Sequence, residues 1–228
     1  IGLIGGMSWE STVTYYQILN TEIKERLGGL HSAKILLYSV DFDEIERCQS
    51  SGDWDRAAQI LSDIAKRLEG AGADLLLICT NTMHKVFDRV QAAVSVPLLH
   101  IGDLTAKALL ERGIHKAALL GTRYTMEEDF YPSRLNAAGI EVVIPNEEER
   151  AMINRVIFDE LCVGILRDSS KAAFLSVVER LAREEGAEGV VLGCTEIPLL
   201  IGKEPASIPF FDTMQIHASG AIAYALAD

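Results

Sequence analysis

Short apolar runs and longer amphipathic stretches alternate along the whole chain. The apolar runs predict buried strands at 1–4, 33–40, 74–78, 96–99, 116–121, 140–144, 189–192 and 208–211. Between them, apolar residues recur every three or four positions and predict helices at 9–27, 53–69, 83–93, 103–112, 126–138, 147–162, 171–185 and 213–227. Strands that alternate with helices favour an α/β fold with mostly parallel sheets and helices on both faces.

Local signals refine this pattern near the N-terminus. Ser8 is a predicted N-cap ahead of Glu10 in the first helical turn, and Gly28 marks the end of that helix. Residues 41–52 are polar and predict a loop. The glycines at 5 and 6 let the backbone approach a ligand, but no complete phosphate-binding signature is present, so an ordinary strand-to-helix turn is favoured.

Two of the apolar runs end in similar polar tips, at 77–84 and at 192–198. Two further pairs of segments match in the same order, 3–10 with 119–126 and 96–100 with 208–212. Roughly 112 to 116 residues separate the members of each pair, which indicates an internal duplication. We therefore expect two pseudo-symmetric domains, one at 1–99 plus 210–228 and the other at 100–209. Because ligands bind at strand ends of parallel sheets, the active site is expected in the cleft between these domains.

Composition limits the partners of the chain. Its 228 residues are 49% hydrophobic and 24% charged, as in ordinary soluble globular proteins, and no apolar run is long enough to span a membrane. A formal net charge of −12 without a Lys/Arg cluster argues against nucleic acid and favours a small molecule. The four cysteines, Cys48, Cys79, Cys162 and Cys194, lack CxxC spacing, so we expect free thiols in the cytoplasm.

Cys194 has the most reactive setting that the pattern predicts. It follows a strand and precedes a helix, so the helix dipole is expected to lower the thiol pKa from about 8.5. A thiolate formed in this way is a competent base or nucleophile. A lone cysteine is more often a buried structural residue, but the position of Cys194 in a duplicated tip favours function.

The residue that matches Cys194 in the first tip is ambiguous. Aligning the two halves pairs Cys194 with either Cys79 or Thr80, and spacing alone fits both. Because side chains alternate along a strand, only one of these neighbours faces the cleft.

Several motifs together resemble the Asp/Glu/hydantoin racemase superfamily over essentially the whole chain. They are Gly5-Gly6-Met7-Ser8, Asn81-Thr82 before Met83-His84, Gly121-Thr122 and Gly193-Cys194-Thr195-Glu196. Within the superfamily the chain is most similar to cofactor-independent aspartate racemases, and among these to the L-aspartate/glutamate-specific racemases of enteric bacteria. In this superfamily the first catalytic cysteine immediately precedes Asn-Thr. The resemblance therefore places Thr80 in the active position, a substitution that the enteric group shares, and makes Cys79 its inward neighbour.

The resemblance implies two-base proton transfer at the α-carbon of aspartate or glutamate, without a cofactor. Cys194 would be the thiolate base, and Thr80 on the other face would donate a proton or position a water. A hydroxyl is a poorer acid or base than a thiol, so slow turnover is expected. Substrate contacts, including donors to the developing enediolate, are expected at Met7, Gln49, Asn81, Thr82, Thr122 and Thr195, with Glu196 binding the substrate ammonium.

Recognition of the distal carboxylate is less defined. Residues 160–164 lack the lysine that the family often carries there, and Arg47 or Arg123 could take its place. His84 and His100 could act as general acids, although a histidine beside a strand end is as often structural. No cluster has metal-ligand spacing, so no metal is expected. Related racemases are commonly dimers, so we expect a homodimer.

Two alternative functions stay open. A decarboxylase or isomerase of the same superfamily would use Cys194 to protonate one face only. A non-catalytic binding protein would hold a small acid in the cleft without turnover, because Thr80 replaces the second thiol.

Overall fold

The computed structural model describes residues 1–202 and 206–227 and divides into two compact units. Unit 1 comprises residues 1–100 and the C-terminal segment from His217, and unit 2 comprises residues 101–216. The second boundary differs from the expected one at 209/210, because residues 210–212 form a strand that pairs within unit 2. Residues 203–205 and 228, which fall in the expected domain ranges, lie outside the described residues.

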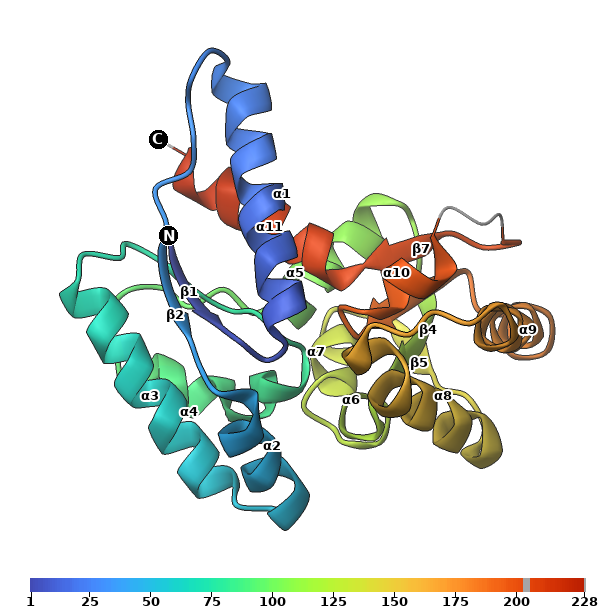
Figure 1. Ribbon diagram of the computed structural model, residues 1–228. Helices are drawn as coiled ribbons and strands as arrows, with labels where there is room; N and C mark the ends of the chain where they lie inside the picture. The colour runs from blue at the N-terminus through green and yellow to red at the C-terminus, as the bar shows by residue number, and fades with distance from the viewer. Residues whose placement is uncertain (203–205, 228) are drawn as a thin grey trace. The chain divides into compact units, whose positions relative to one another are not determined.

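Unit 1 is built on a parallel sheet with strand order β2-β1-β3 (Figure 1). Ile4 of the middle strand pairs with Tyr38 on one side and with Ile78 on the other. The two crossovers run in opposite directions across the sheet, so right-handed connections put α1 and α3 on opposite faces. The elements are β1 (Gly2–Gly5), α1 (Trp9–Leu27), β2 (Leu36–Ser39), α2 (Phe42–Ser51), α3 (Trp54–Gly70), β3 (Leu76–Ile78), the 3₁₀ helix η1 (Thr82–Val86) and α4 (Phe87–Gln91).

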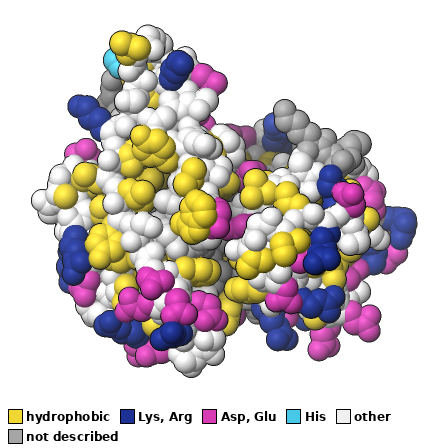
Figure 2. Space-filling model, viewed as in Figure 1, with side chains coloured by type: hydrophobic (Ala, Val, Ile, Leu, Met, Phe, Trp, Pro, Cys, Tyr) yellow, Lys and Arg dark blue, Asp and Glu magenta, His cyan; other side chains and the backbone are white. Residues whose placement is uncertain are grey.

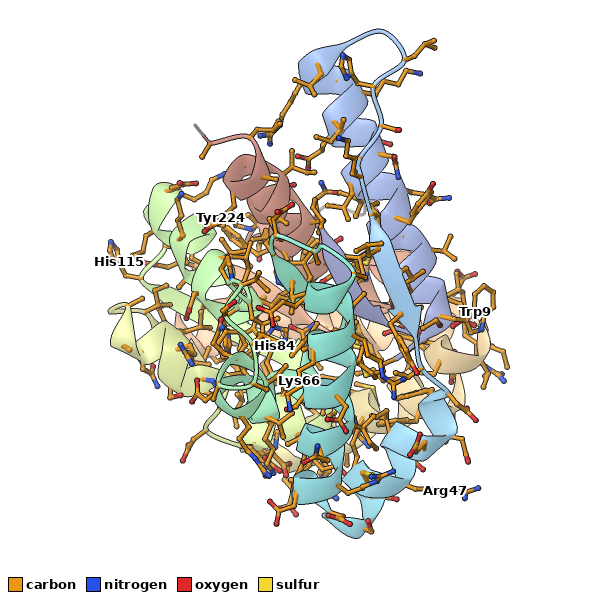
Figure 3. All side chains as sticks on the ribbon, turned by 90° about the vertical axis from the view of Figure 1, so that its left-hand side faces the viewer. Trp9, Arg47, Lys66, His84, His115 and Tyr224 are labelled. Carbon is orange, nitrogen blue, oxygen red and sulfur yellow. The ribbon has the colours of Figure 1, made fainter. Side chains whose placement is uncertain are left out.

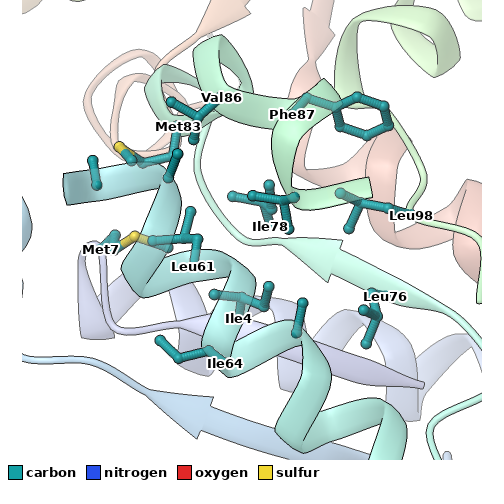
Figure 4. Packing of buried hydrophobic residues seen from close by; sticks show 14 of the residues in the cluster. Ile4, Met7, Leu61, Ile64, Leu76, Ile78, Met83, Val86, Phe87 and Leu98 are labelled. Carbon is teal, nitrogen blue, oxygen red and sulfur yellow. The ribbon is translucent and has the colours of Figure 1, made fainter. Parts of the chain in front are cut away.

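Alternate strand residues supply the core on the two faces of this sheet. Ile4 and Ile78 pack in one cluster with Leu61 of α3 (Figure 4). Leu3 and Leu77 alternate with them along the strands and are also fully buried. Burial of both faces explains why these strands are continuous apolar runs in the sequence.

Unit 2 contains a parallel sheet with strand order β5-β4-β6-β7. Gly121 at the end of β4 lies opposite Gly193 at the end of β6, so both strands end at the same edge. The elements are α5 (Ile101–Glu111), β4 (Lys116–Gly121), α6 (Arg123–Glu127), α7 (Pro132–Ala137), β5 (Glu141–Val143), α8 (Glu147–Asp159), the 3₁₀ helix η2 (Leu161–Val163), α9 (Asp168–Glu185), β6 (Gly189–Gly193), α10 (Ile197–Ile201), β7 (Phe210–Asp212) and the first turn of α11 (Thr213–Ala225), whose residues from His217 belong to unit 1. The predicted α/β class with parallel sheets is confirmed.

The two sheets share one topology, as the sequence duplication predicts. In unit 1, Leu76 of β3 forms a parallel bridge with Leu98. In unit 2, the matching residue of β6, Val190, pairs with Phe210. In each half, the last extended segment therefore lies beside the strand that precedes the polar tip: Leu98 lies beside β3, and β7 lies beside β6.

Matched carboxylates support the turn before that segment in each half. Glu69 accepts a hydrogen bond from the backbone N–H of Ser95 at 2.8 Å, and Glu179 accepts one from that of Ser207 at 2.9 Å. Both carboxylates come from the long helix before the tip-bearing strand. Hydrogen bonds from the two serines lower the pKa of both carboxyls. The duplication thus extends to side chains outside the matched motifs.

One expected loop is a helix. Residues 42–51 form α2, which Asp41 caps at the N-terminus and Gly52 ends in a left-handed conformation. Its buried residues are Ile45 and, three and four positions later, Cys48 and Gln49. This spacing is helical, but the charged residues between these positions hide it in the sequence.

Other expected elements are shorter or broken. The strand at 96–99 is reduced to the single bridge at Leu98. The helix at 126–138 is divided into α6 and α7, and Pro132 begins the second, where its fixed φ and missing N–H are tolerated. The helix at 83–93 begins as the 3₁₀ turn η1, and the one at 147–162 ends at Asp159.

Two glycines are required where the backbone passes close to its neighbours. Gly6 has a φ of 91°, and a Cβ there would lie 2.5 Å from the carbonyl oxygen of Val40. A Cβ on Gly121 would lie 2.8 Å from the carbonyl oxygen of Gly193. Gly6 directly follows the end of β1 and Gly121 ends β4, so a small residue at each position lets the chain pass close to the neighbouring backbone.

The surface carries charges of both signs. On the face shown in Figure 2, Lys and Arg side chains are interspersed with Asp and Glu, together with separate apolar spots. Within the described residues, no helix combines the length and the apolar composition needed to cross a membrane.

Candidate active site

The sequence-predicted residues lie at two strand ends, one in each unit. The first strand end comprises Cys79–Met83, directly after β3, and the second comprises Cys194–Glu196, directly after β6. Each follows a fully buried strand, whose hydrogen bonds to neighbouring strands fix the position of the polar residues.

The first strand end distinguishes between Cys79 and Thr80. Cys79 is fully buried and donates its backbone N–H to the carbonyl of Ile4 at 3.0 Å. Burial raises the pKa of its thiol. Thr80 is partly exposed. This difference agrees with the assignment of Thr80 as the functional neighbour, which stays a prediction.

The other predicted residues of unit 1 are buried at this strand end or in the apolar core of the unit. Gln49 is buried and donates its side-chain amide to the Met83 sulfur at 3.1 Å. Asn81 and Thr82 are also buried. Met7 packs in the apolar core with Met83, so its predicted substrate contact is not evident from its position (Figure 4).

A histidine cluster, formed by His84, His100 and His217, lies behind the first strand end. All three side chains are buried, and Figure 3 shows His84 in the interior. The ring centroids of His84 and His100 lie 4.7 Å apart, and those of His84 and His217 lie 5.6 Å apart. His217 hydrogen-bonds Tyr15 Oη through Nδ1 at 2.8 Å and the carbonyl of Leu99 through Nε2 at 3.0 Å.

Two members of the histidine cluster, His84 and His217, are uncharged at neutral pH. Burial, followed by the charges of His100 and His217, holds the pKa of His84 well below its usual value. Burial lowers the pKa of His217 to about 4. Sequence reasoning considered His84 and His100 only as general acids or lone structural residues, and it missed His217 because the pairing joins the two ends of the chain.

The second strand end contains a thiol bonded to a carboxylate. Cys194 Sγ donates to Glu196 Oε2 at 3.0 Å, and Thr195 Oγ1 donates to the same oxygen at 2.9 Å. All three residues are buried. Glu196, expected to bind a substrate ammonium, is therefore also the hydrogen-bond acceptor of the thiol.

The expected lowering of the Cys194 pKa is wrong. Burial raises the pKa of this thiol well above its usual value, and the negative charge of Glu196 and the neighbouring Cys162 raise it further. The following helix, α10, has only five residues and begins beyond Glu196, so its dipole adds little. In the resting protein Cys194 is a protonated thiol.

Neighbouring residues of unit 2 hold this strand end. Thr213 donates its hydroxyl to the carbonyl of Leu192 at 2.8 Å. Thr122, a predicted substrate contact, is buried at the adjacent end of β4, where its side chain caps α6. Thr213 was not predicted, although it directly follows the matched segment 208–212 and this position could have indicated it.

The two arginines considered for the distal carboxylate lie on the surface. The Arg47 side chain is 76% exposed and pairs with Asp43 at 2.7 Å (Figure 3). The Arg123 side chain is 60% exposed and pairs with Glu127 at 3.4 Å. Exposed ion pairs of this kind are weak, so either side chain can exchange its partner for a ligand.

The structure thus groups Gln49, Thr80, Asn81 and Thr82 in unit 1, and groups Thr122, Cys194, Thr195 and Glu196 in unit 2. Within residues 1–202 and 206–227, no group of three or more His, Cys, Asp or Glu side chains is arranged to hold a metal ion.

These features define a duplicated α/β protein with a thiol at one strand end and a hydroxyl near the matched position of the other. Residues 4–221 match the family model described as Asp/Glu/Hydantoin racemase. The chain belongs to this family.

Relatives agree with this membership. The broad specificity amino-acid racemase RacX of Bacillus subtilis is 26% identical over 179 residues, which cover 77% of this chain and 75% of RacX. The structure of a candidate Asp/Glu racemase from Yersinia pestis is 54% identical, with a TM-score of 0.93, over 99% of this chain and 98% of that one. An aspartate racemase homologue from Pyrococcus horikoshii is 41% identical, with a TM-score of 0.87 and the same coverage. Together they support an amino-acid racemase activity.

Replacing Glu196 tests the electrostatic control of Cys194. Glu196→Gln removes a negative charge that raises the thiol pKa, so Cys194 should ionise at lower pH. We expect iodoacetamide to alkylate Cys194 at pH 8 at least about threefold faster than in the wild type, measured by peptide mass spectrometry. Glu188→Gln, at the opposite end of β6, should leave the rate unchanged. An unchanged or slower rate in Glu196→Gln would show that the carboxylate does not govern the thiol.

The histidine cluster predicts acid lability. The unfolded chain binds a proton on His217 near pH 6.5, whereas the folded protein does so only near 4, so stability is present above pH 6.5 and is lost as the pH falls toward 4. His217→Gln should reduce the loss of unfolding free energy between pH 7 and pH 5 by about 2 kcal/mol. Urea denaturation at both pH values measures this difference. His31→Gln, at an exposed histidine, is the control, and equal losses in the wild type and His217→Gln would contradict the prediction.

Proposed function

We propose that the protein is a cofactor-independent racemase that interconverts the L and D forms of aspartate, glutamate or both. The observation that carries this proposal is the buried thiol of Cys194, which donates to the Glu196 carboxylate at a strand end. A base that must remove a weakly acidic α-proton needs both a thiolate and a place for the thiol proton, and this pair supplies both.

The first step is proton removal by the second strand end. The thiol proton moves from Cys194 to Glu196, and the resulting thiolate takes the α-proton of the substrate. Cys194 is then a thiol again, Glu196 is a carboxylic acid, and the substrate is a carbanion with enediolate character. The raised pKa of Cys194 makes its thiolate a strong base once formed.

The second step is proton delivery to the opposite face of the α-carbon. In this proposal Thr80 donates its hydroxyl proton to the carbanion, or orients a water that does so. The site resets when Glu196 returns its proton to solvent and the donor on the Thr80 side regains one from water. Because a hydroxyl is a weaker acid than a thiol, this step is expected to limit turnover.

Polar groups at both strand ends are proposed to stabilise the intermediate. Asn81, Thr82 and Thr195 are buried donors, and buried donors stabilise developing negative charge more strongly than exposed ones do. Thr122 at the adjacent end of β4 is proposed to contact the substrate, together with Gln49. Preorganised hydrogen bonds would take the place of a cofactor in this scheme.

The choice of acidic substrates rests on relatives. Structures 54% and 41% identical to the chain are described as a candidate Asp/Glu racemase and an aspartate racemase homologue. RacX, at 26% identity, is described as having broad specificity. The exposed Arg47 and Arg123 are the proposed partners of the distal carboxylate of the substrate. Assays with a panel of other amino acids test how broad the substrate specificity is.

Proton NMR in heavy water tests the proposal directly. The purified protein without added cofactor should remove the α-proton signal of L-aspartate or L-glutamate, and chiral chromatography should detect the D isomer. Cys194→Ser should lower the rate at least about a hundredfold, because it replaces the thiol by a much weaker acid. Ser176→Ala, at an exposed position of α9, is the control. Absence of exchange with both acids and with the panel would refute the proposal.

A further inference from the structure

The ring of His84 is bonded to the backbone of Thr80. His84 Nδ1 lies 2.8 Å from the carbonyl oxygen of Thr80, and the backbone N–H of His84 donates to the carbonyl of Asn81 at 3.0 Å. Two hydrogen bonds from one residue therefore close the turn between β3 and η1. The orientation of the Thr80 hydroxyl depends on the backbone at 80 and 81, which these two hydrogen bonds hold.

The direction of the ring hydrogen bond fixes the state of His84. A carbonyl oxygen can only accept, so Nδ1 must carry the proton. Burial and the two neighbouring imidazoles keep the ring neutral against the opposing effect of the Thr80 and Leu99 backbones, and the hydrogen bond to Thr80 selects the Nδ1–H tautomer. The ring is held in place by stacking on Phe87, with centroids 5.9 Å apart and planes 11° apart.

The rest of the histidine cluster links this ring to the sheet. His217 bonds Tyr15 through one ring nitrogen and the carbonyl of Leu99 through the other. Leu99 in turn donates its N–H to the carbonyl of Leu76 in β3 at 3.1 Å. His84 thus packs against His217, whose hydrogen-bond partner Leu99 is bonded to β3, the strand that precedes Thr80.

We propose that His84 is the positioning residue of Thr80 and that it acts through the Nδ1–H hydrogen bond to the Thr80 carbonyl. This inference rests on the proposed function, in which Thr80 delivers the second proton. A weak acid such as a hydroxyl tolerates little misplacement, because proton transfer requires it within hydrogen-bond reach of the carbanion. Loss of the hydrogen bond should therefore slow inversion without changing substrate binding.

Two variants separate the hydrogen bond from packing. His84→Asn keeps a donor near the position of Nδ1, whereas His84→Leu fills the space without a donor. We expect His84→Leu to lower kcat at least about tenfold with KM changed less than about twofold, and His84→Asn to stay within about threefold of the wild type. His84→Gln, whose amide reaches the position of Nε2 instead, should behave like His84→Leu and serves if the leucine variant does not fold.

A second measurement is the ratio of the rate of α-proton exchange to the rate of inversion at the α-carbon, determined in heavy water with each enantiomer of the substrate. With Thr80 displaced, Cys194 can still remove and return a proton on its own face, so His84→Leu should raise this ratio. Alkylation of Cys194 at the wild-type rate shows that unit 2 is intact. Equal losses in His84→Leu and His84→Asn, or parallel losses of exchange and inversion, would overturn the inference.

The outcomes separate this inference from the proposed function. A wild type that neither exchanges nor inverts any amino acid of the panel overturns both. A wild type that is active, with a His84→Leu variant of equal kcat and equal exchange ratio, overturns only the role of His84.

Discussion

Parallel pairing of β3 and β6 with their neighbours is the constraint on which the remaining structure depends. Both strands are buried on two faces, so their polar residues can begin only where the strands end. Thr80 and Cys194 occur at these ends, next to small residues such as Gly193 that allow close backbone approach. Both units have the same topology, and Glu69 and Glu179 support matching turns. These matches indicate that the two strand ends arose by duplication of one unit.

Burial gives the two strand ends different electrostatic characters. At the second, one carboxylate, Glu196, accepts from a thiol and a hydroxyl and keeps Cys194 protonated at rest. At the first, three imidazoles are packed together, burial keeps His84 and His217 neutral, and the ring of His84 hydrogen-bonds the backbone of Thr80. In the proposed mechanism, a proton moves between Cys194 and Glu196 at one strand end, while hydrogen bonds fix the backbone geometry at the other. This division suits a proton transfer in which a strong base and a well-placed weak acid act in turn.

Local sequence patterns predicted the fold class, the duplication and both strand ends, because apolar runs and repeated motifs record burial directly. They missed α2, where charged residues between Ile45 and Gln49 hid the helical spacing. They also missed the bond between Tyr15 and His217, which are separated by nearly the whole chain. The thiol pKa was predicted in the wrong direction, because a dipole argument from residue order could not show that the thiol is buried or that the Glu196 side chain turns back onto it.

The most direct test of this account is hydrogen–deuterium exchange in a Thr80→Val variant, followed separately with the L and D forms of the better substrate. Valine has the shape of threonine without the hydroxyl. If Cys194 and Thr80 act on opposite faces, inversion should fall at least about a hundredfold, while exchange with retained configuration persists for one enantiomer only. Inversion at the wild-type rate, or exchange that persists equally for both enantiomers, would contradict the two-face mechanism.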